Sequence, residues 1–109
     1  MFLILSKKAT EEEIEKVAKD IDGYIKFVVD IKNNILAAGG TLHADAEKKL
    51  LTQGSKQEDL WGGGLDLETG EVDFDSMINL RPSQGNSSRE VLSSDLRNKI
   101  EEIVRRLLK

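Results

Sequence analysis

The chain has 109 residues, a mass of 12.1 kDa and a formal net charge of −4 at pH 7. This is the length of one domain, residues 1–109, and 39% hydrophobic content is ordinary for a globular chain. The absence of cysteine excludes a disulfide framework, a thiol nucleophile and cysteine-based metal sites. Because no apolar run could span a membrane or form a signal-peptide core, we expect a cytoplasmic protein without membrane contact.

The charge is unevenly distributed along the chain. Residues 55–80 contain one basic residue, Lys56, against seven acidic ones, whereas residues 81–109 contain seven basic and four acidic residues. Nonspecific binding to nucleic acid needs a dense basic surface. The acidic balance therefore makes a nucleic-acid partner unexpected.

The N-terminal half predicts a strand, a helix and a hairpin. Residues 1–5 form a short apolar run, and Thr10 and Glu13 then fit a capping box that begins a helix ending near Gly23. Residues 24–31 and 35–38 are rich in β-branched and apolar residues, which favours two strands. Since Asn33 and Asn34 both tolerate positive φ, we expect a type I′ turn between these strands.

A second helix is predicted to begin between Thr41 and Asp45, with Asp45 as its cap, and to run to about Gln53. Three glycines, residues 62–64, permit a close backbone approach or positive φ, and a second hairpin made of residues 65–67 and 72–80 follows them. The alternating acidic residues of this hairpin indicate a solvated strand face that discourages edge-to-edge aggregation. They are Asp66, Glu68, Glu71, Asp73 and Asp75.

The C-terminal part predicts a long polar loop and a final helix. The loop covers residues 81–89, and Ser93 or Ser94 caps a helix with an apolar stripe that ends at Leu108. The order β-α-β-β-α-β-β-α indicates an α+β fold, a two-layer sandwich of a mostly antiparallel sheet with helices packed on it. A mixed sheet with helices on both faces is the alternative.

His43 is the only histidine and therefore the only side chain with an unperturbed pKa near neutrality. In a helix, Glu47 shares its face, and Asp45 lies at the helix start. His43, Asp45 and Glu47 are therefore candidate catalytic residues, and His43 with Glu47 is a candidate metal-ligand pair. A partly exposed histidine at a helix N-terminus is the structural alternative.

A second group of polar residues suggests a binding site for a small anion. Arg81 offers a bidentate fork to a carboxylate or phosphate, and the polar loop after it is of the kind that often binds ligands. An ion pair between Arg81 and a preceding acidic residue is the structural alternative. The ligand-binding candidates are Gln57, Asp59, Trp61, Arg81, Gln84 and Asn86. The glycines match neither a dinucleotide fingerprint nor a P-loop, so no cofactor is implied.

Three segments together carry a resemblance: residues 42–47, residues 53–62 and residues 75–86. They resemble a family of small prokaryotic proteins catalogued only as a domain of unknown function, and the likeness covers nearly the whole chain. The resemblance implies a bacterial or archaeal source and a complete single-domain protein. It assigns no catalytic role to any residue.

Three functional hypotheses follow. The first is a small binding or assembly module, a homo-oligomer with a site for a small anionic ligand, because no complete catalytic motif is present. The second is an enzyme in which His43 acts as general acid or base and Arg81 holds an anion, with or without a metal. It requires His43 and Arg81 to share one pocket. The third is a regulatory protein that presents its acidic hairpin to a basic partner.

Overall fold

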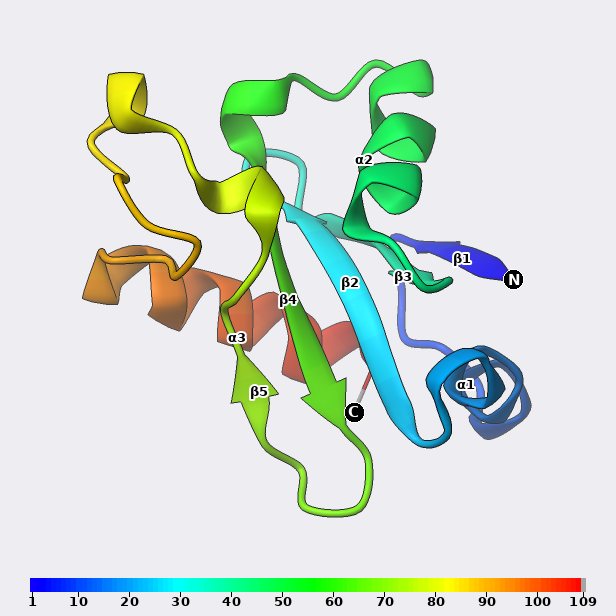
Figure 1. Ribbon diagram of the computed structural model, residues 1–109. Helices are drawn as coiled ribbons and strands as arrows, with labels where there is room; N and C mark the ends of the chain where they lie inside the picture. Colours follow the sequence, from blue (N-terminus) through cyan, green and yellow to red (C-terminus); the bar gives the residue numbers. More distant parts are fainter. Residues whose placement is uncertain (109) are drawn as a thin grey trace.

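The computed structural model describes residues 1–108, which form one sheet and three α-helices (Figure 1). Five strands have the order β1-β3-β2-β4-β5, and every neighbouring pair is antiparallel. The predicted α+β class and the antiparallel sheet are therefore confirmed. The elements are β1 (Phe2–Leu5), α1 (Glu11–Ala18), β2 (Tyr24–Asp30), β3 (Ile35–Gly39), α2 (His43–Thr52), β4 (Leu60–Asp66), β5 (Val72–Asp73) and α3 (Ser94–Leu108).

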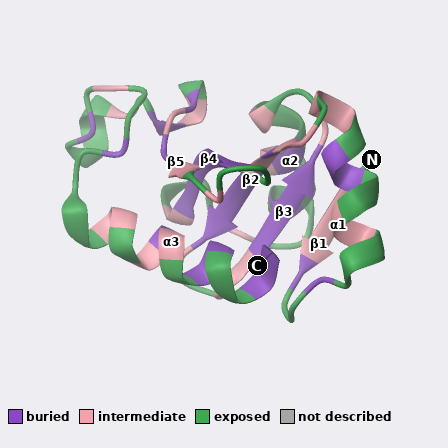
Figure 2. Cartoon of the chain, turned by 90° about the horizontal axis from the view of Figure 1, so that it is seen from below, coloured by how far each residue is buried: buried purple, intermediate pink, exposed green. Residues whose placement is uncertain are grey.

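Helices cover both faces of the sheet. Ile25, Phe27 and Val29 of β2 pack in one core with α1 and α3, while Val28 of β2 and Ala37 of β3 pack in a second core under α2. Figure 2 shows the central strands β2, β3 and β4 almost wholly buried between these layers. The helices are thus divided between two faces rather than gathered in the single layer that the sequence suggested.

The strand order explains this division. The connection through α1 leads from β1 to β2 across β3, and the connection through α2 leads from β3 to β4 across β2. Both connections advance in the same direction across the sheet, but they leave from strands that point in opposite directions. Since such crossovers are almost always right-handed, the two helices must lie on opposite faces.

The first helix begins as predicted, and the first hairpin differs in its turn. Thr10 accepts a hydrogen bond from the backbone of Glu13, whose side chain accepts one from the Thr10 backbone, so the capping box is present. The turn between β2 and β3 spans four residues, 31–34, and only Asn34 has positive φ. The type I′ prediction is wrong because the Asp30 carboxylate accepts hydrogen bonds from the turn amides and stabilises a longer turn.

Strand β4 runs without interruption through Gly62, Gly63 and Gly64, none of which has positive φ. The strand therefore begins at Leu60, earlier than the predicted Leu65, and of the two alternatives for the glycines positive φ does not apply. The predicted strand over residues 72–80 is wrong beyond Asp73, because the Ser76 hydroxyl accepts a hydrogen bond from the Ile78 amide and starts a 3₁₀ turn. After β5 the chain leaves the sheet and forms two 3₁₀ turns, Met77–Asn79 and Pro82–Gln84, before α3 begins.

Candidate functional site

A cavity of about 510 Å³ lies where the N-terminus of α2 meets β2, β5 and the segment after β5. This volume is within the range of small-molecule sites. One part of the lining is polar and consists of Tyr24, Lys26, His43, Asp73, Asp75, Ser76, Arg89 and Glu90. The other part is apolar and consists of Leu42, Ala44, Met77 and Ile78.

The glycines of β4 make room for these side chains. A Cβ on Gly62 would lie 2.8 Å from the Ser76 Cβ and 3.1 Å from the His43 Cδ2, and a Cβ on Gly64 would lie 1.7 Å from the Tyr24 hydroxyl. Side chains from three other segments can therefore lie directly on the strand because it carries none of its own here. The close approach that the sequence allowed at these glycines is present, and it positions the site.

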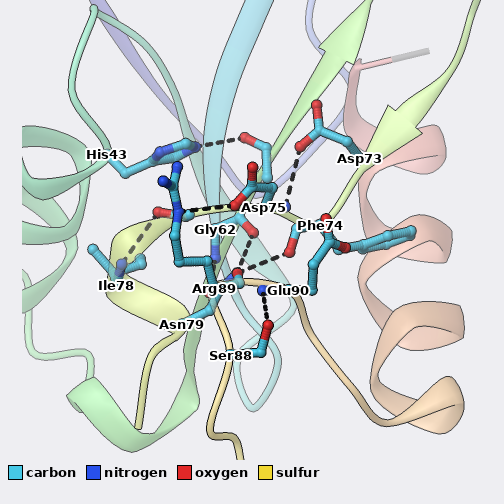
Figure 3. Close-up of polar contacts among 12 residues, drawn as sticks. His43, Gly62, Asp73, Phe74, Asp75, Ile78, Asn79, Ser88, Arg89 and Glu90 are labelled. Atoms are coloured by element: carbon cyan, nitrogen blue, oxygen red, sulfur yellow. Dashed lines mark hydrogen bonds and ion pairs between the residues drawn. The ribbon is translucent and has the colours of Figure 1, made fainter.

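His43 is the first residue of α2, and its ring is held by the backbone of β4. The Nε2 atom lies 2.7 Å from the Gly63 carbonyl oxygen, which can only accept, so Nε2 carries the proton (Figure 3). Burial lowers the pKa of His43, an effect that outweighs the hydrogen bond to Gly63. His43 is therefore neutral at pH 7, with an Nδ1 atom that has no hydrogen-bond partner within residues 1–108.

Each carboxylate of the cavity already has a partner. The Tyr24 hydroxyl donates to Asp73 Oδ2 at 2.5 Å, and burial together with this contact raises the pKa of Tyr24. Asp75 Oδ1 lies 3.2 Å from Arg89 Nε (Figure 3). Glu90 Oε2 forms an ion pair of 3.0 Å with Arg97. Each carboxylate thus has a hydrogen-bond or ion-pair partner within the protein, and Asp75 and Glu90 are paired with a cation.

The cations of the cavity retain unused hydrogen-bonding capacity. Lys26 forms no ion pair with any residue in 1–108, and the terminal amino groups of Arg89 make no hydrogen bond within that range. In addition, no side chain caps the N-terminus of α2, whose first residues line the cavity. Leu42 occupies the N-cap position, and Asp45 lies in the first turn, so the prediction of Asp45 as cap is wrong.

Arg81 and three other predicted ligand-binding residues form a separate cluster. The guanidinium donates to the carbonyls of Gln57 and Leu60 and to the Gln84 side chain, and it stacks 3.9 Å from the Trp61 ring centroid. Arg81 does not line the cavity that contains His43. The requirement of the enzyme hypothesis that both residues share one pocket is therefore not met.

Asn86 is buried and uses its side chain within the protein. Its Nδ2 donates to the carbonyls of Asn79, Ser88 and Glu90, and its Oδ1 accepts from the Leu92 amide. With its amide committed in this way, it offers nothing to a ligand, contrary to the prediction.

Asn79, which sequence reasoning missed, is equally committed and joins the segment after β5 to β4. Its Oδ1 accepts from the Gly62 amide, and its Nδ2 lies within hydrogen-bond distance of the carbonyls of Gly62, Phe74 and Arg89 (Figure 3). Because Asp75 directly follows Phe74 in the chain, the hydrogen bonds to Phe74 and Arg89 hold both Asp75 and Arg89 at the cavity.

The remaining candidates lie apart from one another. Asp45 lines a second cavity of about 500 Å³ between α2 and β1. Glu47 is half-buried on α2 with Oε2 lacking a hydrogen-bond partner, and Asp59 ends a short 3₁₀ turn. No three histidine, aspartate or glutamate side chains in residues 1–108 come together as metal ligands, so no third ligand joins His43 and Glu47.

Comparison with known proteins gives a family and no further relatives. No curated protein and no solved structure matches the chain. Within residues 1–108, no helix combines the length and apolar character needed to cross a bilayer. The family model described as "Protein of unknown function (DUF5674)" matches residues 3–107, and the chain therefore belongs to that family.

Proposed function

We propose that the protein is a binding module for a small anion and that the cavity beside His43 is its site. One observation carries the proposal: the carboxylates of the cavity have partners, whereas Lys26 and the terminal amino groups of Arg89 do not. A site with spare cationic donors and committed acceptors favours an anionic ligand.

The two cations differ in what they offer a ligand. The planar fork of Arg89 can donate two parallel hydrogen bonds to a carboxylate, and its Nε is held in place by Asp75. Lys26 adds a flexible point charge from the middle of β2. Arg89 thus takes the role that the sequence suggested for Arg81, and His43 Nδ1 adds a hydrogen-bond acceptor.

Because His43 is the only histidine, its ring proton signals in an NMR spectrum need no assignment. We expect acetate or inorganic phosphate to shift these signals in a saturable way. Lys26→Gln should weaken binding about tenfold, since it removes a charge-assisted hydrogen bond. Lys48→Gln, an exposed lysine that does not line this cavity, is the matched control. Identical curves for the two variants would contradict the proposal.

We also propose the oligomeric state, the location and the source that the sequence predicts. A homo-oligomer is supported by β1, a strand without charged residues at one edge of the sheet, and sedimentation over a range of concentrations tests it. A cytoplasmic location and a prokaryotic source are supported by the cysteine-free composition and by the resemblance to a family of prokaryotic proteins.

A further inference from the structure

The mouth of the cavity is apolar and exposed. Met77 and Leu42 have the highest exposed fractions among the large hydrophobic residues of the described chain, 61% and 58%, and both line the cavity. Ala44 and Ile78 extend the same wall. The charged residues Asp75, Arg89 and Glu90 of the same lining are similarly exposed. An exposed apolar rim beside charged groups is a feature of sites whose ligand has one polar and one apolar end.

The position of Leu42 strengthens this reading. It occupies the N-cap of α2, where serine, threonine, aspartate and asparagine are favoured because they satisfy the free backbone amides. A leucine there makes no capping hydrogen bond, and its exposure shows that it contributes little to the core. Neither helix stability nor core packing accounts for it, whereas contact with an apolar ligand group would.

The charge of the site limits the charge of the ligand. Two cations, Lys26 and Arg89, line the cavity together with the three carboxylates Asp73, Asp75 and Glu90. A doubly charged phosphate would be repelled by these carboxylates more strongly than a singly charged group. A carboxylate also matches the fork of Arg89.

From these observations we infer that the ligand is a monocarboxylate with an apolar tail. Its carboxylate contacts Lys26 and Arg89, and its tail lies against Leu42 and Met77. This inference rests on the proposed function, because it takes the same cavity as the anion site and adds the chemical class of the ligand.

A series of straight-chain acids tests the inference directly. The His43 NMR signals are followed while acetate, butyrate, hexanoate and octanoate are added to the full chain. We expect the affinity to rise about three- to fourfold for each methylene that the apolar wall covers. Heptylamine, which has the seven-carbon tail of octanoate and the opposite charge, should bind at least tenfold more weakly than octanoate.

Substitutions of Leu42 and Met77 test whether these residues cause the gain in affinity along the series of acids. Leu42→Ser and Met77→Ser should each remove most of the gain in affinity from acetate to octanoate, measured as the ratio of the two affinities in each variant. Leu92→Ser is the matched control, because Leu92 is similarly exposed, at 54%, and does not line the cavity. Circular dichroism melts check that all three variants are folded.

The possible outcomes separate this inference from the proposed function. If acetate and octanoate bind equally well, or if the rim variants retain the full gain, the apolar-tail inference is wrong while the anion site stands. Inorganic phosphate binding more tightly than octanoate would also overturn it. If no anion shifts the His43 signals, the proposed function itself fails.

Discussion

Two arginines eight positions apart show how differently the same side chain can be used. Arg81 donates to two backbone carbonyls and to Gln84 and stacks on Trp61, so its guanidinium holds two segments together. Arg89 makes one ion pair, with Asp75, and its side chain is 58% exposed at a cavity. The unused hydrogen-bonding capacity of a residue, rather than its type, distinguishes a binding group from a structural one.

The largest effect is expected where a structural residue supports the binding region. Asn79→Ala leaves the buried amide and carbonyl of Gly62 without partners, whereas the carbonyls of Phe74 and Arg89 keep backbone donors. The loss should lower the free energy of unfolding by about 3–4 kcal/mol. Urea unfolding measures the change. Asn98→Ala, on an exposed face of α3, is the control and should cost less than about 0.5 kcal/mol. Similar losses in both variants would contradict the assigned role of Asn79.

The space that Gly64 of β4 leaves for Tyr24 can be tested with a double-mutant cycle. Gly64→Ala places a methyl group within 1.7 Å of the Tyr24 hydroxyl and should lower stability by about 2–3 kcal/mol. In a Tyr24→Ala background the same change should cost much less, because the obstructing ring is gone. Equal costs in the two backgrounds, measured by urea unfolding, would show that Tyr24 is not the obstacle.

Removing each arginine in turn sharpens the comparison between them. Arg81→Ala should lower the free energy of unfolding by about 2 kcal/mol and leave acetate affinity unchanged, since it breaks only internal contacts. Arg89→Ala should lower stability by less than about 0.5 kcal/mol, because its ion pair is exposed, and should reduce acetate affinity at least tenfold. Urea unfolding and NMR titration of both variants measure this. The reverse pattern would exchange the two roles.

The smallest effect is expected at Asp30, an acidic residue that is fully buried and whose two carboxylate oxygens both accept hydrogen bonds. Burial alone would raise the pKa of this carboxyl, but hydrogen bonds from Ser55, Asn33 and the backbone outweigh it and hold the pKa below its usual value. A lowered pKa in the folded state means that the stabilisation is complete above pH 3.8 and is lost as the pH falls below it.

Asp30→Asn is the test of this dependence. Between pH 7 and pH 3 the original chain should lose more stability than the variant, as measured by urea unfolding at both values. Ser55→Ala, which removes one donor to the carboxylate, should give an intermediate loss. An identical loss in the original chain and Asp30→Asn would show that Asp30 does not contribute to acid sensitivity.

The sequence predicts most elements of this fold because their causes are local. The capping box at Thr10, the apolar stripe of α3 and the β-branched and aromatic residues of β2 each act over a few neighbouring residues. The path of β4 could not be predicted in this way. Its glycines left close approach and positive φ equally open, and the reason for them lies in side chains distant in sequence, such as Tyr24 and His43.

The candidate site was only partly visible for the same reason. His43 stood out as the sole histidine, and the structure places it in the cavity. Lys26 was missed, and its only local indication is that it is one of two charged residues, with Asp30, on strand β2. Nothing local separates Arg89 from Arg81, because the two carbonyls that hold Arg81 lie more than twenty residues earlier in the chain.

At the three glycines of β4, the stability of the strand and the function of the site make opposite demands. Glycine is among the poorest strand formers, and valine or isoleucine at positions 62–64 would raise the local preference for a strand. Any such side chain would collide with the groups that now occupy the space above and below it. A redesign that optimised this strand for stability alone would therefore fill the site, and selection for the site alone would keep the strand weak.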